Sequence, residues 1–151
     1  MIIKIRRNTF ESNSSSVHTL SIDKSGREPS RLPINKKTNK VIAHFGNFGK
    51  DYNVYTSQED KLAYLMTNLY YLNHMDNEDI ADRWDFGAIS DAISNYCGCD
   101  GIEIDMSYGE EPYIDHQSIP YDDIEIIDVY DKDSVIDFVF NKYVSLKTDC
   151  D

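Results

Sequence analysis

The sequence predicts an α+β fold, in which a mostly antiparallel sheet is covered by three or four helices. Short runs that alternate apolar and polar residues, such as residues 101–106, are typical of half-buried strands. Residues 57–74 instead place leucines at three- and four-residue steps, which is typical of a helix with one buried face. The 151 residues, 40% of them hydrophobic, are enough for one domain, residues 1–151, around a single core.

Two alternating runs near the start, residues 2–7 and 17–22, are predicted to be neighbouring strands. Residues 10–18 join them and hold four serine hydroxyls, an amide, a carboxylate and an imidazole. Serine and asparagine favour turns because their side chains bond to nearby backbone groups. A tight turn without chemistry is therefore one interpretation of this segment.

The other interpretation is a site in which Ser14, Ser15 or Ser16 acts with His18. A nucleophilic serine needs a base within hydrogen-bond reach and a third group that orients the base. Ser16 and His18 are two residues apart, so their side chains would share one face of an extended strand.

Residues 23–40 are predicted to form a long basic loop, because they contain six lysines and arginines and two prolines. Loops of this length are uncommon in small domains and are often functional. The segment has no aromatic residue between its charges on which a base could stack, so direct nucleic-acid binding is not expected.

The middle of the chain is predicted to begin with strands at residues 41–45 and 52–55, separated by a turn at Gly46–Gly49. The longest helix is expected to begin near Ser57 and to end near His74. Thr56 is expected to cap it, with Glu59 reaching back.

A short helical piece is expected after Asn77, and a further helix over residues 86–96 that ends at Gly98. Strands are then predicted at residues 101–106, 113–116 and 124–129. A final helix is expected to be capped by Asp131 or Asp133, and the last few residues are expected to fray.

A second polar group, Asp115-His116-Gln117-Ser118, lies at a predicted strand end, where functional sites are common. If the sheet brings His116 beside the serine cluster, the chain has the parts of a Ser/His/Asp site. Asp115 and His116 are adjacent, however, so on a strand they point to opposite faces, and Asp115 is a poor orienter of His116.

The segment Phe10-Glu11-Ser12-Asn13-Ser14-Ser15-Ser16-Val17-His18 resembles the N-terminal signature of a family of small uncharacterised phage and prophage proteins. Residues 41–46 and 113–118 fit the same family. The resemblance implies a phage setting, with the protein in the cytoplasm of the infected bacterial host. It implies no activity, because the family has none assigned.

The C-terminal half resembles the closing strands of ADP-ribosyltransferase-type folds, on residues 99–104 and 119–127. That resemblance implies an enzyme that handles NAD, with Glu110, Glu111 or Asp115 as the acid near the nicotinamide ribose. The opening Arg or His of such a fold would be Arg6, Arg7 or His18. The sequence departs from the pattern because it has no clear Glu-x-Glu or Gln-x-Glu motif.

Charge is divided unevenly along the chain. Residues 1–50 carry a net charge of +7 and residues 51–151 a net charge of −19, which gives −12 for the whole chain. The acidic part would repel phosphates but would attract a basic partner. It could also receive the basic part of its own chain, or serve solubility alone.

Other sequence features limit the possible settings. No run of 18 apolar residues is present, so no membrane span is expected, and the N-terminus lacks the apolar stretch of a signal peptide. Three cysteines, Cys97, Cys99 and Cys150, suggest no disulfide framework, and no pair of histidines completes a zinc site with them. No metal is expected.

Two functional hypotheses follow. The first is an accessory protein that binds a host or anti-phage-defence protein through an acidic surface that includes Glu110, Glu111, Asp122 and Asp123, without a cofactor. The second is a small enzyme centred on the Ser/His/Asp residues 14–16, 18, 115 and 116, with NAD as its cofactor. The oligomeric state is not predicted.

Overall fold

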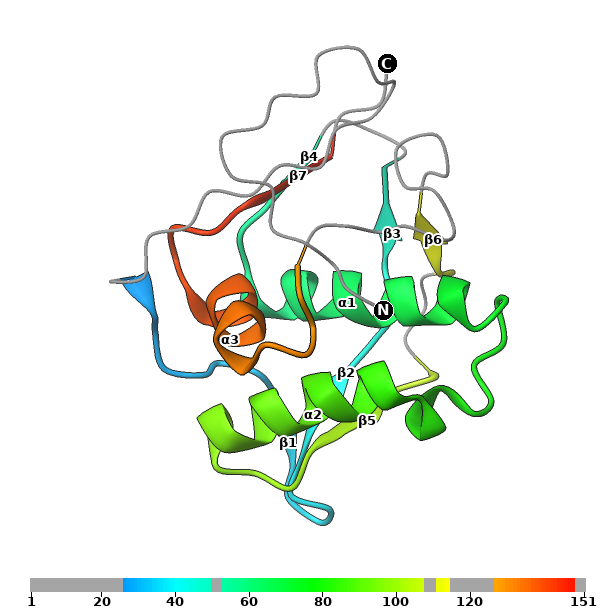
Figure 1. Cartoon of the computed structure of the whole chain (residues 1–151), viewed down its shortest axis with the longest axis horizontal. Helices are drawn as coiled ribbons and strands as arrows, with labels where there is room; N and C mark the ends of the chain where they lie inside the picture. The colour runs from blue at the N-terminus through cyan, green and yellow to red at the C-terminus, as the bar shows by residue number, and fades with distance from the viewer. Residues whose placement is uncertain (1–25, 50–52, 108–110, 115–126, 149–151) are drawn as a thin grey trace.

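The fold is built around a central helix, α1 (Gln58–Leu72), which is buried on nearly all sides. The computed structural model describes residues 26–49, 53–107, 111–114 and 127–148, and within them it confirms the predicted α+β class (Figure 1). The other helical elements are the 3₁₀ helix η2 (Ile80–Asp82), α2 (Trp84–Cys97) and α3 (Lys132–Phe140). Helix α3 packs against both α1 and α2.

The described strands are short and form three small sheets rather than one. Their bounds are β1 (Ile34–Asn35), β2 (Lys40–Ala43), β3 (Asn47–Phe48), β4 (Asn53–Tyr55), β5 (Ile102–Ile104), β6 (Tyr113–Ile114) and β7 (Leu146–Thr148). The sheet orders are β1-β2-β5, β3-β6 and β4-β7. Pairings β1–β2 and β4–β7 and the isolated bridge Arg27–Asn141 are antiparallel, whereas β2–β5 and β3–β6 are parallel.

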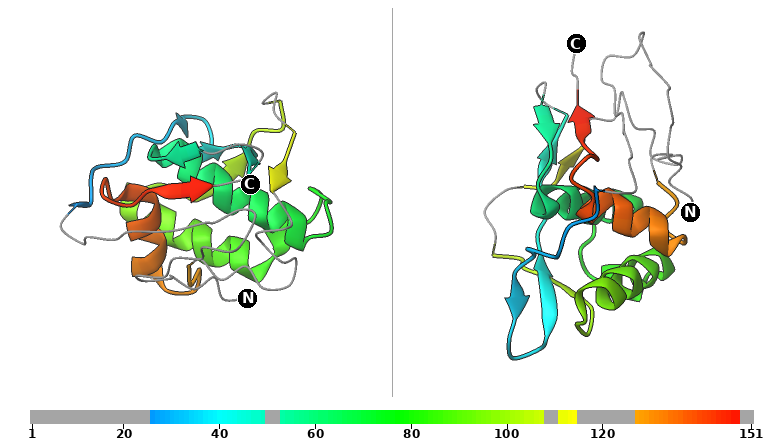
Figure 2. Two further views of the ribbon diagram at one scale, coloured as in Figure 1. Left: turned by 90° about the horizontal axis from the view of Figure 1, so that it is seen from above. Right: turned by 90° about the vertical axis from the view of Figure 1, so that its left-hand side faces the viewer.

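The sheets lie on different sides of the helices. In Figure 1 and in the right-hand view of Figure 2, the β4–β7 pair is at the upper end of the molecule and the β1–β2 hairpin is at the lower end. Parallel strands need a long crossover, and here α1 and α2 provide it between β2 and β5.

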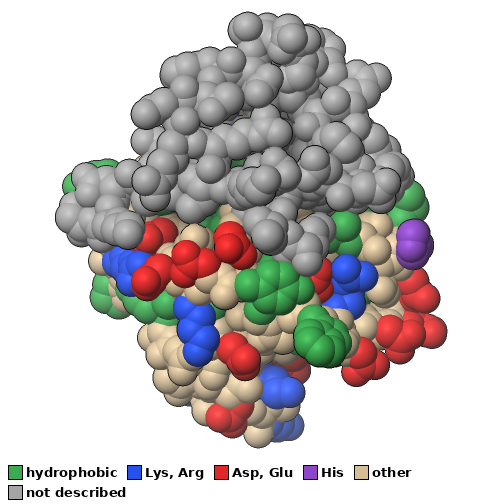
Figure 3. All heavy atoms as spheres, in the orientation of Figure 1, with side chains coloured by type: hydrophobic (Ala, Val, Ile, Leu, Met, Phe, Trp, Pro, Cys, Tyr) green, Lys and Arg blue, Asp and Glu red, His purple; other side chains and the backbone are tan. Residues whose placement is uncertain are grey.

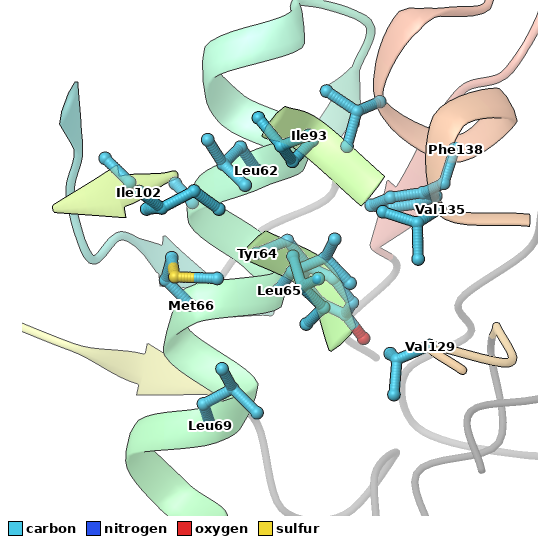
Figure 4. Packing of buried hydrophobic residues seen from close by; sticks show 14 of the residues in the cluster. Leu62, Tyr64, Leu65, Met66, Leu69, Ile93, Ile102, Val129, Val135 and Phe138 are labelled. Atoms are coloured by element: carbon cyan, nitrogen blue, oxygen red, sulfur yellow. The ribbon is translucent and has the colours of Figure 1, made fainter. Parts of the chain in front are cut away.

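The hydrophobic core surrounds α1 and draws one face from each neighbouring element. Figure 4 shows Leu62, Leu65 and Leu69 of α1 near side chains from α2, α3 and β5, all of them buried. A helix that is apolar on one face only would lie at the surface, whereas α1 is enclosed because α2, α3 and the strands cover different faces.

Helix α1 begins at the predicted place but with a different cap. Ser57, not Thr56, is the N-cap, and its Oγ accepts a hydrogen bond of 3.1 Å from the backbone N–H of Asp60. Both residues have capping side chains, so the sequence alone does not distinguish them. Helix α2 ends as predicted, with Gly98 in the left-handed conformation at φ 69°.

The predicted loop over residues 23–40 is more ordered than expected in its described part, residues 26–40. Strand β1 and the start of β2 form a hairpin there. Arg27 donates from Nε to Asp137 Oδ1 at 2.7 Å and from Nη2 to Asp133 Oδ1 at 3.2 Å, so two acids of α3 receive this basic residue. Leu32 is buried in the core.

Two local predictions are wrong. The turn expected at Gly46–Gly49 contains β3, which pairs with β6. Residues 127–129, the described end of a predicted strand, are not in a strand. The turn prediction failed because β3 is defined by a partner distant in sequence. Residues 149–151, at the end expected to fray, lie outside the described residues, and β7 just before them pairs with β4.

Candidate functional site

Nearly all residues singled out from the sequence lie outside the described part of the chain. They are Ser14, Ser15, Ser16, His18, Glu110, Asp115, His116, Asp122 and Asp123, together with the predicted strands at residues 2–7 and 17–22. Glu111 is described and is exposed just before β6. The Ser/His/Asp hypothesis therefore stays a prediction.

The described cysteines are not arranged for chemistry. Cys99 is buried and its Sγ lies 3.6 Å from the carbonyl oxygen of Gly101. Burial raises the pKa of the Cys97 thiol, which disfavours the reactive thiolate. Within residues 26–49, 53–107, 111–114 and 127–148, no group of three or more His, Cys, Asp or Glu side chains could hold a metal ion.

The described surface has one segment with an unusual combination of charge and exposure, residues 73–85 between α1 and α2. It contains five acids and a single arginine. The exposed side chains of this segment include two large apolar ones, and we call the following set the Trp84 surface: Met75, Asp76, Glu78, Asp79, Asp82 and Trp84.

The backbone of this segment is held in a conformation that is unfavourable for most residues. His74, Met75 and Asp79 have φ of 57°, 62° and 57°, in the left-handed region without being glycine. Each such residue costs roughly 1–2 kcal/mol, and conformations of this kind cluster at functional sites. The loop shape is therefore maintained against its local preference.

Arg83 locks the segment to both helices. Its Nε and Nη2 donate to the two oxygens of Asp85 at 2.9 and 3.1 Å, and its Nη1 donates to the carbonyl oxygen of Leu72 at 3.3 Å. Asp85 is buried and also accepts from the backbone N–H of Phe86. The hydrogen bond to Asp85 raises the pKa of Arg83 above its ordinary value, so the guanidinium keeps its charge.

Trp84 stands between these two locked residues and is left in solvent. It is the first residue of α2 and 87% of its surface is exposed. A tryptophan is usually largely buried, so this exposure is informative. Because Arg83 and Asp85 turn inward to each other, the residue between them is displayed outward on a rigid helix start.

Tyr130 adds a second aromatic residue close to this surface. It is half exposed, and burial together with the negative charge of Asp85 raises the pKa of its hydroxyl. On the face drawn in Figure 3, hydrophobic side chains lie beside both acidic and basic ones. An exposed aromatic residue on an acid-rich segment can receive the cationic side chain of a partner, which is attracted by both the ring and the charges.

The sequence did contain a signal for this surface. The chain has one tryptophan, and it follows a run with four acids within seven residues, Asp76–Asp82. A core aromatic is normally surrounded by apolar residues, whereas Trp84 is directly flanked by Arg83 and Asp85. A lone tryptophan within a charged stretch is a reason to expect a binding surface.

Comparisons with protein-family models, with curated proteins and with solved structures gave no match for this chain. Among the helices in the described part of the chain, none has the length and apolar character needed to cross a membrane.

Proposed function

We propose that this chain is a phage-encoded accessory protein that binds a basic host or anti-phage-defence protein through its acidic surface, with Trp84 at the centre of the contact. The observation that carries the binding function is the 87% exposure of Trp84 on a rigid, acid-rich segment. The phage setting is supported by the resemblance of residues 10–18 to the phage signature.

The energetics of protein interfaces support this role for Trp84. Tryptophan is enriched among the few residues that dominate binding, and truncation of such a residue costs about 2 kcal/mol or more. The Arg83–Asp85 pair holds the helix start in place before binding, so little conformational freedom is lost when a partner docks.

The acidic residues give the surface its selectivity. Asp76, Glu78, Asp79 and Asp82 are exposed and close in sequence, and within residues 73–85 only Arg83 opposes them. Such a field accelerates encounter with a basic protein and rejects acidic ones. A lysine or arginine of the partner placed over the Trp84 ring would add a cation–π contact of about 0.5–2 kcal/mol.

The test begins with capture of bacterial proteins on the full-length chain, followed by titration of the purified captured protein by calorimetry. Trp84→Ala is expected to weaken binding at least tenfold, or about 1.4 kcal/mol. Tyr143→Ala is the control, because Tyr143 is another exposed aromatic residue, half exposed, but lies in the turn after α3. Trp84→Ala should leave the free energy of unfolding nearly unchanged, because the side chain is exposed.

Charge reversal provides the second part of the test. Glu78→Lys with Asp82→Lys should weaken binding and reduce its dependence on salt, whereas Asp100→Lys, beyond the other end of α2, should not. A captured protein that binds the Trp84→Ala and charge-reversal variants as tightly as the original chain would contradict the proposal.

The binding and enzyme hypotheses make opposite predictions for the serine and histidine residues. If binding is the whole function, alanine at Ser16, His18 and His116 should leave partner binding and biological activity unchanged. Loss of biological activity in these variants, with partner binding intact, would favour the Ser/His/Asp enzyme.

A further inference from the structure

A pocket of about 200 Å³ lies where the N-terminus of α1 meets the C-terminal end of α3, well separated in sequence from residues 73–85. Eight of its ten lining residues are polar or charged, and Val139 and Phe140 form an apolar side. The complete lining is Glu28, Arg31, Thr56, Ser57, Gln58, Glu59, Lys61, Val139, Phe140 and Lys142. The volume is below the range of pockets for drug-sized molecules, so it fits a small ligand.

Lys61 is the unusual residue of this pocket. It is 1% exposed, yet it carries an amine that is charged in water. Its Nζ donates to the carbonyl oxygens of Asn141 and Val144 at 3.0 and 3.1 Å. An ammonium has three protons, and in the described part of the chain these two oxygens are its only hydrogen-bond acceptors.

No ion pair among the described residues includes Lys61. Glu28 lines the same pocket and attracts the Lys61 charge, but its carboxylate is paired with Arg31 Nη2 at 2.9 Å. Buried charges in proteins are normally paired. Here burial outweighs the attraction of Glu28, and the pKa of Lys61 falls to about 8.

The walls around Lys61 are fixed by hydrogen bonds among the lining residues and to Pro29. The Gln58 side chain accepts from the backbone N–H of Arg31 at 2.6 Å and donates to the carbonyl oxygen of Pro29 at 3.0 Å. The backbone N–H of Glu28 donates to the carbonyl oxygen of Phe140 at 2.9 Å. The cavity is therefore formed before any ligand enters.

We propose that this pocket binds a small molecule with one carboxylate, which accepts the remaining proton of Lys61 while the rest of the molecule lies against Val139 and Phe140. Three cationic residues line the pocket against two acidic ones, and the Arg31–Glu28 pair removes one charge of each sign, which leaves Lys61 and Lys142 against Glu59. This balance suits a single negative charge. A dianionic phosphate would exceed this net charge and would meet repulsion from Glu59.

The ligand would relieve the buried charge of Lys61. A carboxylate beside the ammonium favours its charged form, so binding should raise the pKa of Lys61. Binding and the pKa of one specific nitrogen are thus linked. A ligand elsewhere on the surface would leave that pKa unchanged, which makes the site testable without knowledge of the natural ligand.

The probes are acetate, succinate and benzoate, each added to the full chain with chloride at equal ionic strength as the reference. NMR would follow the backbone amides of Ser57 and Gln58 and the titration of the Lys61 amine. At least one monocarboxylate is expected to give saturable shifts in the millimolar range and to raise the Lys61 pKa, with succinate weaker than acetate. Lys61→Met should reduce the affinity at least tenfold, whereas Lys142→Met, at the pocket rim, should reduce it less.

The proposal is overturned if no carboxylate gives saturable shifts at about 50 mM, where even a binder of Kd near 10 mM would be mostly bound. It is also overturned if shifts occur but the Lys61 pKa stays the same, because the carboxylate would then bind elsewhere. If Lys61→Met does not fold, the pKa measurement on the unmodified chain decides alone.

Discussion

Lys61→Met should change how the stability of the protein depends on pH. The substitution removes a buried amine and keeps an unbranched side chain of similar length. The Lys61 pKa falls from its ordinary value of 10.5 to about 8 in the folded chain, mainly because burial disfavours the charged form. Between these two pH values the unfolded chain binds a proton that the folded chain does not.

The direction and the size of this pH dependence follow from the linkage between proton binding and folding. The folded state carries the full penalty for a buried charge below pH 8, the penalty declines as the pH rises from 8 to 10.5, and it is absent above that range. The penalty is about 3 kcal/mol at pH 7 and about 1.4 kcal/mol at pH 9.5. The original chain should therefore gain about 2 kcal/mol relative to Lys61→Met between pH 7 and pH 9.5.

Urea unfolding, followed by far-ultraviolet circular dichroism at several pH values, measures this difference. Trp84 fluorescence is a poor reporter because the ring is exposed before unfolding. Comparing the two proteins at each pH cancels the titration of cysteines and tyrosines. Lys142→Met, which removes an exposed lysine, controls for the loss of one positive charge.

A constant stability difference between the original chain and Lys61→Met across this pH range would refute the reasoning. It would mean that the amine is as well solvated in the folded chain as in water, through relaxation of the structure around it. A difference that changes in the opposite direction would mean that the folded state favours the charged form, as an anion beside Lys61 would cause.

Two further predictions concern helix formation. Ser57→Ala should lower the free energy of unfolding by about 1 kcal/mol because it removes the cap of α1. Thr56→Ala, one residue earlier, should change it by less than about 0.5 kcal/mol. Equal effects of the two substitutions in chemical denaturation would contradict the assigned cap. Gly87→Ala should stabilise the protein by about 0.5–1 kcal/mol, because Gly87 is inside α2 and an added Cβ would meet no atom within 4 Å. A lower thermal unfolding midpoint for this variant would contradict the expected stabilisation.

The helices were predictable because their signals are local. Leu62, Leu65 and Leu69 recur on one face, and a capping side chain and Gly98 mark helix ends, so periodicity and end signals agree with the observed α1 and α2. Helix α3 likewise begins after Asp131, one of the two expected caps. These features depend on residues within one or two turns of each other.

The short strands were less predictable because their partners are far away in sequence. Strand β3 has two residues and pairs with β6 about 65 residues later, and β7 pairs with β4. Alternation over two or three residues is too short to identify a strand, and nothing local specifies parallel pairing between β2 and β5. The hydrogen bonds that define these strands form only when the helices have brought them together.

The candidate surface was missed for a similar reason. The acidic character of the second part of the chain was evident from the sequence, and it guided the binding hypothesis. The position of Trp84 outside the core depends on Arg83, which reaches Leu72 and Asp85 at once. The buried state of Lys61 depends on carbonyl groups about 80 residues later.

The contacts between residues 26–28 and the end of α3 have a consequence for synthesis of the protein. Arg27 and Glu28 bond to Asp137 and Phe140, and β4 pairs with β7, so the two ends of the described fold hold each other. The ribosome makes β4 roughly 90 residues before β7, a delay on the order of ten seconds at about 5–20 residues per second. During that interval α3 and β7 are still missing, so the apolar faces of α1 lack part of their cover and the nascent chain is more exposed to aggregation until β7 has emerged.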